Sequence, residues 1–130
     1  GCGQPAMHSK VLNAAHEFIL VMESSGEAGR AIKHSYFQRG ELSNNWKVSR
    51  GPFVQTAGNN ASFPLDLARK AIVNFSPETG IVYDTFAGLG STLIAAHQLK
   101  RRWIGSEISS EYVDLANKRL EPYLAQTQLF

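Results

Sequence analysis

The apolar positions of this 130-residue chain follow two kinds of pattern, and each kind predicts a different type of element. Short, mainly apolar stretches at residues 16–22, 81–84 and 103–108 predict strands, and the first, which is the most continuous, is typical of a buried strand. Apolar residues at helical spacing predict three helices, one starting at Ser62, one over residues 91–100 and one following Ser109. The two serines are suitable helix caps, and Pro122 should end or kink the last helix.

The stretch over residues 81–92 contains the end of a predicted strand, a glycine turn and the start of a predicted helix. A strand ends in Asp84, a turn with Gly88 and Gly90 follows, and a helix begins directly after it. A strand, a tight glycine turn and a helix form the entry to a nucleotide-type site in α/β folds, because glycine lets the backbone approach a ligand closely. The carboxylate of Asp84 would repel a phosphate, but it would favour a ligand that carries an ammonium group.

A second acidic residue ends the next predicted strand. Glu107 lies roughly 20 residues beyond the glycine turn, where an acid can accept hydrogen bonds from ribose hydroxyls. An adenosine ligand with a cationic tail would satisfy both carboxylates. S-adenosylmethionine has this chemistry, and we expect it to be the cofactor.

The sequence also resembles a known family. The stretch D-T-F-A-G-L-G-S-T at residues 84–92, followed by A-A, R-W-I-G-S-E, Y, A and R-L up to Leu120, is similar to the DNA amino-methyltransferases of DNA methylation and restriction-modification, which modify adenine N6 or cytosine N4. The core F-x-G-x-G is intact, whereas Thr85, Leu89 and Ser91 depart from the family pattern. The resemblance covers residues 63–120. It implies a partial Rossmann-like α/β fold of the S-adenosylmethionine-dependent methyltransferases, with a truncated sheet.

The resemblance also implies which residues hold the cofactor. Asp84 should meet its methionine end, Glu107 its ribose, and Phe86 and Ile108 the region of its adenine. The implied cofactor-binding residues are Phe63, Pro64, Asp84, Phe86, Ala87, Gly88, Gly90, Ser91, Thr92, Glu107 and Ile108.

One element of the family pattern is missing from the sequence. The resembled enzymes hold the target amine with a [D/N/S]-P-P-[Y/F] tetrapeptide, and this chain contains no Pro-Pro pair. No residue can therefore be named as catalytic, and whether the chain is an enzyme is left open. We expect activity only with a catalytic partner chain. In the resembled family, the strand that carries this tetrapeptide lies next to the strand at residues 81–84. Its absence would leave a sheet edge open, so we also expect either that partner or a homodimer.

Residues 23–62 form a long predicted loop at the position of the family's target-recognition region. The loop mixes aromatic and basic residues, and Arg39, Lys47 and Arg50 are candidates for DNA contact. The alternative is a solvated loop whose aromatic side chains attach it to the core. We expect a single partial methyltransferase domain over residues 8–130, with residues 1–7 as a tail.

Composition limits the remaining possibilities. The net charge of +2 permits DNA binding without requiring it, and a single cysteine, Cys2, cannot form an intramolecular disulfide. No apolar run reaches the roughly 20 residues of a membrane span, so we expect a cytoplasmic protein. His16 and Glu17 begin like a zinc motif, but Leu20 occupies the position of the second histidine, so no metal site is expected.

Two other functions stay open. A dinucleotide-binding oxidoreductase should have a third glycine in its turn, where this chain has Leu93. A non-catalytic binding or assembly module could use the same fold, because a fold does not define a function.

Overall fold

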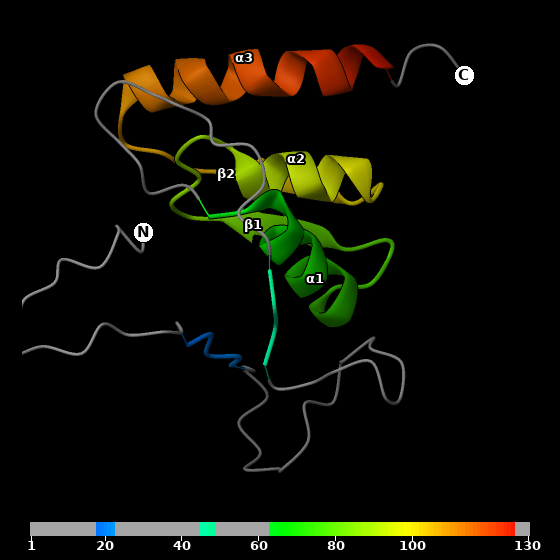
Figure 1. Cartoon of the computed structure of the whole chain (residues 1–130). Helices are drawn as coiled ribbons and strands as arrows, with labels where there is room; N and C mark the ends of the chain where they lie inside the picture. The colour runs from blue at the N-terminus through cyan, green and yellow to red at the C-terminus, as the bar shows by residue number, and fades with distance from the viewer. Residues whose placement is uncertain (1–17, 23–44, 49–62, 127–130) are drawn as a thin grey trace, which may run out of the picture. The chain divides into compact units, whose positions relative to one another are not determined.

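A computed structural model describes residues 18–22, 45–48 and 63–126 of the chain. The third range contains helix α1 (Leu65–Phe75), strand β1 (Ile81–Asp84), helix α2 (Ser91–Gln98), strand β2 (Arg102–Gly105) and helix α3 (Ser110–Gln126), in this order (Figure 1). All five elements lie in one compact unit, His34–Phe130, whereas residues 18–22 belong to another. None of the helices in these ranges combines the length and the apolar character needed to cross a bilayer.

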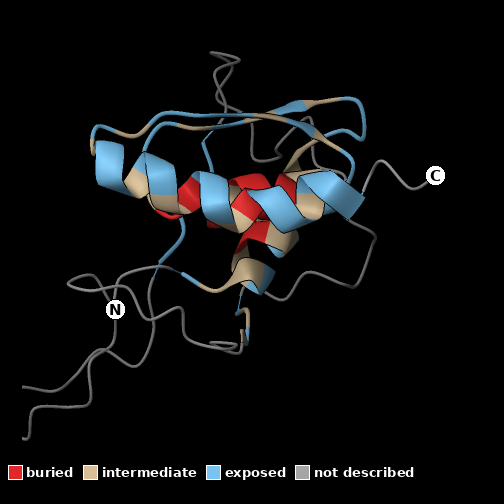
Figure 2. Cartoon of the chain, turned by 90° about the horizontal axis from the view of Figure 1, so that it is seen from above, coloured by how far each residue is buried: buried red, intermediate tan, exposed pale blue. Residues whose placement is uncertain are grey.

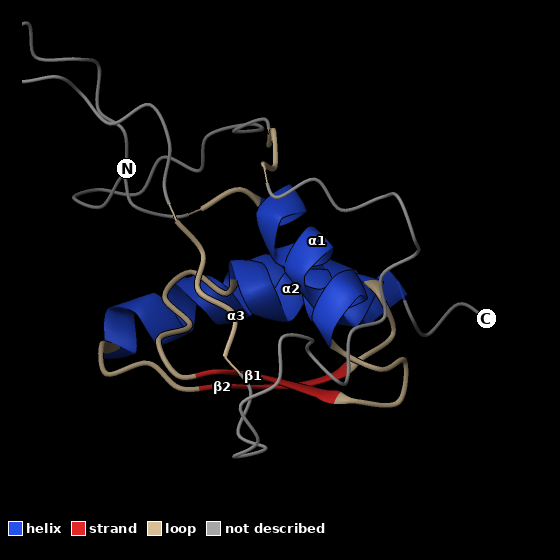
Figure 3. Ribbon diagram, turned by 90° about the horizontal axis from the view of Figure 1, so that it is seen from below, coloured by secondary structure: helices blue, strands red, loops and turns tan. Residues whose placement is uncertain are grey.

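The two strands form a parallel sheet that is covered on one face. Ile81 pairs with Arg102 at one end and Asp84 with Gly105 at the other, and α2 connects the strands. All three helices lie on the same side of this sheet (Figure 3). The opposite face exposes apolar side chains, since Ile81, Tyr83 and Ile104 are 51%, 59% and 52% exposed. Parallel sheets are normally covered on both faces, so this apolar face is unusual.

Helix α2 is the centre of the core. Ala95 and Ala96 are fully buried, and Ile94 is 2% exposed. The small alanines let α1 approach closely and bury Ala68, while Leu120 of α3 packs beside Ile94. In Figure 2, the buried parts of the chain gather where the helices meet, and exposed residues cover the outer helix surfaces.

The glycine at the end of β2 is required by this packing. A Cβ atom built on Gly105 would lie 2.7 Å from Cδ1 of Leu93 and 3.1 Å from Cβ of Ala87. Gly105 therefore allows α2 and the turn before it to lie directly on the strand.

The structure confirms the predicted strand at residues 81–84 and the predicted helices, with shifted ends. Strand β2 stops at Gly105 instead of continuing to residue 108, because the chain then turns toward α3. Helix α3 continues past Pro122 to Gln126, so the first of the two predicted effects, an end of the helix at Pro122, is not found. Pro122 and Lys118 are both exposed, and water can solvate the carbonyl that loses its hydrogen bond.

The predicted buried strand at residues 16–22 is not found where the structure describes it. Residues 18–22 have no regular structure, and Phe18, Leu20 and Met22 are each more than 80% exposed. An apolar run forms a strand only when another strand accepts its backbone hydrogen bonds. Within the described ranges, the sheet consists of β1 and β2.

Replacing Gly105 with alanine should test the close approach of α2 to the sheet. The added methyl group must displace Leu93 or Ala87, so we expect Gly105→Ala to lower the free energy of unfolding by about 1–3 kcal/mol. Urea unfolding measures this loss. The control Ile104→Val changes the neighbouring residue on the exposed face, and it should stay within about 0.5 kcal/mol of the wild type. Equal effects of both variants would contradict the packing described here.

Candidate functional site

The carboxyl ends of β1 and β2 meet at one edge of the sheet. Asp84 and Gly105 are paired there, and backbone hydrogen bonds continue beyond both strands. The Ser106 amide donates to the carbonyl of Asp84 over 2.9 Å, and the Ala87 amide donates to the carbonyl of Ser106, also over 2.9 Å. The glycine turn is thereby held next to the segment that follows β2. In open α/β sheets, this edge is where ligands bind.

The glycine turn has a conformation that other residues rarely adopt. Gly88 and Gly90 have φ angles of 51° and 76°, both in the left-handed region. The Gly90 amide donates to the carbonyl of Ala87 over 2.8 Å, which closes the turn directly before α2. A Cβ atom on Gly90 would lie 3.2 Å from Cβ of Ala116, so the turn also lies close to α3.

Glu107 links the glycine turn to the start of α3. Its Oε2 accepts a hydrogen bond from the Gly88 amide over 2.9 Å, and its Oε1 accepts one from the Ser109 amide over 3.0 Å. The bond from Ser109, followed by that from Gly88, lowers the pKa of the Glu107 carboxyl below its usual value. Each carboxylate oxygen has a second lone pair, so Glu107 can still accept hydrogen bonds from a ligand's hydroxyl groups.

The lowered pKa of Glu107 gives the turn a defined pH dependence. The pKa of Glu107 is lower in the folded than in the unfolded chain, so the ionised carboxylate stabilises the folded state. This stabilisation is fully present above the usual glutamate pKa. It is lost as the pH falls through the lowered value. At neutral pH Glu107 is therefore ionised and holds both amides.

Asp84 supplies the second carboxylate of the site. Its Oδ1 accepts a hydrogen bond from the Phe86 amide over 3.0 Å, which fixes the side chain at the start of the turn. The side chain of Phe86 is 87% exposed, and that of Ile108, next to Glu107, is fully exposed. Two carboxylates with exposed apolar side chains beside them fit a ligand that has hydroxyl groups, a cationic part and a flat ring. S-adenosylmethionine is such a ligand.

The remaining predicted cofactor residues lie at two helix starts. Ser91 is buried and Thr92 is half-buried in the first turn of α2. Phe63 and Pro64 directly precede Leu65. Leu65 and Ala87 both pack against the apolar cluster of Leu93, Ile94 and Leu120. Phe63 is 42% exposed, so its ring is accessible to a ligand. The roles of these residues stay predictions.

The predicted DNA-contacting residues are only partly described. Lys47 is exposed, and its carbonyl accepts a hydrogen bond from Nζ of Lys70 over 3.4 Å, whereas Arg39 and Arg50 lie outside the described residues. The ring of Trp46 stacks on Phe75 of α1, with ring centroids 6.4 Å apart. This contact agrees with the alternative in which aromatic side chains attach the loop to the core.

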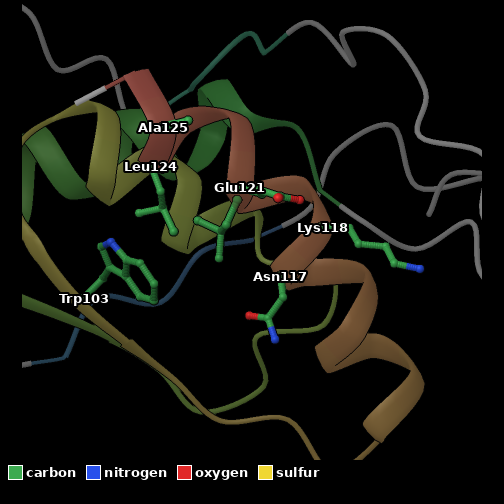
Figure 4. Close-up of a pocket in the computed structure, with 7 residues that line it drawn as sticks. Trp103, Asn117, Lys118, Glu121, Leu124 and Ala125 are labelled. Carbon is green, nitrogen blue, oxygen red and sulfur yellow. The ribbon is translucent and has the colours of Figure 1, made fainter. Parts of the chain in front are cut away.

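A groove is lined by residues of β2 and α3. It has a volume of about 500 Å³, and Trp103, near the start of β2, forms one wall beside Leu124 (Figure 4). The lining residues are Trp103, Asn117, Lys118, Leu120, Glu121, Leu124 and Ala125. None of the predicted cofactor residues is among them. In the described part of the chain, no group of His, Cys, Asp and Glu side chains could hold a metal ion.

Two features of the site were not predicted from the sequence. The Ser109 amide donates to Glu107, although the sequence indicated Ser109 only as a helix cap. A guanidinium nitrogen of Arg119 donates to the carbonyl of Leu89 in the glycine turn, 30 residues earlier in the chain. Sequence spacing carries no signal for such a distant contact.

Comparison with known proteins agrees with this geometry. The chain matches the family model for DNA methylases of the N6/N4 type over residues 2–118, and it therefore belongs to this family. The resemblance and the Rossmann-like methyltransferase fold expected from the sequence are thus confirmed.

The most similar relatives include an orphan methyltransferase and a type II methyltransferase. M.BamHII of Bacillus amyloliquefaciens is 37% identical over 105 residues, which cover 76% of this chain and 40% of that protein. M.Cfr9I of Citrobacter freundii is 32% identical over 113 residues, 82% of this chain and 37% of that protein. The chain thus spans about 40% of the length of these relatives.

A solved structure supports the same fold. The crystal structure of the M1.HpyAVI–SAM complex superimposes with a TM-score of 0.55 at 27% sequence identity. The superposition covers 66% of this chain and 44% of that chain.

The two glycines of the turn should differ in their tolerance of alanine. Either substitution places an L-residue in the left-handed region, at a cost of about 1–2 kcal/mol. At Gly90 the new methyl group would also lie 3.2 Å from Cβ of Ala116, whereas Gly88 has no neighbouring atom closer than 3.9 Å. We therefore expect Gly90→Ala to lower the free energy of unfolding more than Gly88→Ala, measured by urea unfolding. A larger loss at Gly88 would show that the turn is not packed against α3.

Proposed function

We propose that this chain is the cofactor-binding part of a site-specific DNA amino-methyltransferase that modifies adenine N6 or cytosine N4. Its cofactor is S-adenosylmethionine. The observation that carries the proposal is the Glu107 carboxylate in the segment directly after β2, held by the amides of Gly88 and Ser109. The ionised carboxylate next to the glycine turn can accept hydrogen bonds from the hydroxyl groups of a ribose.

Each side of the cofactor has a matching group in the site. Glu107 accepts hydrogen bonds from the ribose hydroxyls, and Asp84 attracts the cationic methionine end. Phe86 and Ile108 provide exposed apolar surface for the adenine. Phe63, in front of α1, contacts the methionine part. When bound, S-adenosylmethionine supplies an activated methyl group for the target amine.

The chain provides this binding site but needs a further element for methyl transfer. An exocyclic amine is a poor nucleophile, and in the resembled enzymes the Pro-Pro tetrapeptide, absent from this sequence, positions it. The exposed apolar face around Tyr83 and Ile104 supports association with another chain that covers the sheet. That chain is a catalytic partner or a second copy. Basic residues of the loop, Lys47 among them, contact the DNA backbone.

Calorimetry with S-adenosylmethionine and with NAD tests the cofactor assignment. We expect the chain to bind S-adenosylmethionine more tightly than NAD. Glu107→Gln should weaken binding by about tenfold or more, because its amide group cannot accept all the hydrogen bonds that the carboxylate accepts. The control Glu111→Gln makes the same charge change on an exposed residue in the first turn of α3, and it should bind as the wild type does.

The outcomes separate the candidate functions. Tighter binding of NAD would favour a dinucleotide-dependent enzyme. Weak binding of both ligands would favour a non-catalytic assembly module. Equal loss in Glu107→Gln and Glu111→Gln would show that the site lies elsewhere.

Methyl transfer should require a second chain. We expect the pure chain to transfer no radiolabelled methyl group to unmethylated genomic DNA, because nothing in it holds the target amine. Adding a methyltransferase chain that carries the tetrapeptide but lacks its own cofactor-binding part should restore transfer. The control is a mixture with Glu107→Gln, which should restore less. Robust turnover by the pure chain would contradict the proposal.

A further inference from the structure

In the described part of the chain, one cationic side chain of α3 forms a hydrogen bond to the glycine turn. Arg119 is half-buried in the middle of α3, and its Nη1 donates to the carbonyl of Leu89. Leu89 lies between the two left-handed glycines, and its own side chain is 7% exposed. The hydrogen bond therefore reaches the backbone at the centre of the turn.

The position of that carbonyl affects the rest of the turn. The Leu89 carbonyl and the Gly90 amide belong to one planar peptide group, so fixing the first also fixes the second. The Gly90 amide donates to Ala87, and on the other side of Leu89 the Gly88 amide donates to Glu107. Glycine rotates easily about its backbone bonds, so a second partner, outside the turn, restricts this peptide further.

We propose that Arg119 is a positioning residue for the cofactor site. Its guanidinium holds the Leu89 carbonyl toward α3 and thereby keeps the Gly88 amide on the Glu107 carboxylate. Glu107 then presents its remaining lone pairs to the ligand in one fixed orientation. This inference rests on the proposed function, because it concerns the same site.

Packing contacts and a hydrogen bond between Nε2 of His97 and the carbonyl of Tyr123, 3.1 Å apart, also hold α3 in place. Leu120 is 2% exposed against Ile94, and Ala116 is 6% exposed beside Gly90. The neighbouring side chains of α3 thus supply the contacts that hold the helix, and the guanidinium of Arg119 adds a directed hydrogen bond to the turn. An arginine suits this half-buried position, because a guanidinium stays charged even though burial lowers the pKa of Arg119.

Arg119→Met, in the 130-residue chain, removes the donor but keeps an unbranched, apolar side chain on α3. We expect S-adenosylmethionine to bind about tenfold more weakly, as measured by calorimetry. Arg119→Lys restores a cationic donor, and it should bind within about threefold of the wild type. Arg119→Gln, which is too short to reach Leu89, replaces the methionine variant if that variant does not fold, and it should weaken binding to the same degree.

Arg101→Met is a matched control at the other end of the fold. Arg101 is also half-buried and also donates to backbone carbonyls, those of Leu99 over 3.0 Å and Ser76 over 3.3 Å. Its loss should lower the melting temperature without changing the affinity for S-adenosylmethionine.

A second readout does not depend on the cofactor. The pKa of Glu107, followed by NMR in the absence of ligand, should rise toward its usual value in Arg119→Met, because the bond from Gly88 weakens. It should stay unchanged in Arg101→Met. A merely structural role of Arg119 would not move this pKa selectively.

The outcomes distinguish the inference from the proposed function. If the wild type does not bind S-adenosylmethionine, the proposed function fails, and the pKa of Glu107 still tests the positioning role. If the wild type binds and Arg119→Met binds equally well with an unchanged Glu107 pKa, the positioning role is overturned. Equal losses in Arg119→Met and Arg101→Met, or equal losses in Arg119→Met and Arg119→Lys, would overturn it as well.

Discussion

The close approach of α2 to its neighbours is the constraint on which the rest of this unit depends. The helix lies against the sheet at Gly105, against α1 at Ala95 and Ala96, and against α3 where Gly90 meets Ala116. Every one of these contacts requires a small residue, because protein interiors are packed too tightly to accept an added methyl group without strain. Among the described residues, Ala95 and Ala96 are completely buried next to the larger Ile94.

The same small residues that allow this packing also form the site. Gly90 brings the start of α2 close to α3, and Gly105 brings β2 close to Leu93 and Ala87. As a result, the glycine turn lies within hydrogen-bonding distance of Glu107. Core packing and ligand geometry are therefore coupled, and a substitution that loosens the core around α2 will also displace the carboxylate.

The sequence predicted the parts of the structure that depend on local patterns. The strand over residues 81–84, the turn with its glycines, the helix after it and the position of Glu107 follow from neighbouring residues. The carboxylate of Asp84 at the strand end could also be placed in this way. These elements have strong local preferences, because glycine alone readily adopts the left-handed turn and the helix begins at once after it.

Features that depend on distant residues could not be predicted. The run at residues 16–22 has the composition of a strand, but forming one requires a pairing partner that composition does not supply. The end of β2 at Gly105 depends on the turn toward α3. The bond from Arg119 to Leu89 joins residues 30 positions apart. Only the packing of α3 on α2 brings these two residues together.

The two tryptophans lie away from the carboxyl ends of the strands, and this has a consequence for optical measurements. Trp46 stacks on Phe75 at the end of α1, and Trp103 packs in the core near the start of β2. Neither ring belongs to the cofactor site around Glu107. Intrinsic tryptophan fluorescence will therefore report the unfolding of this unit, while occupation of the site will leave the emission spectrum almost unchanged.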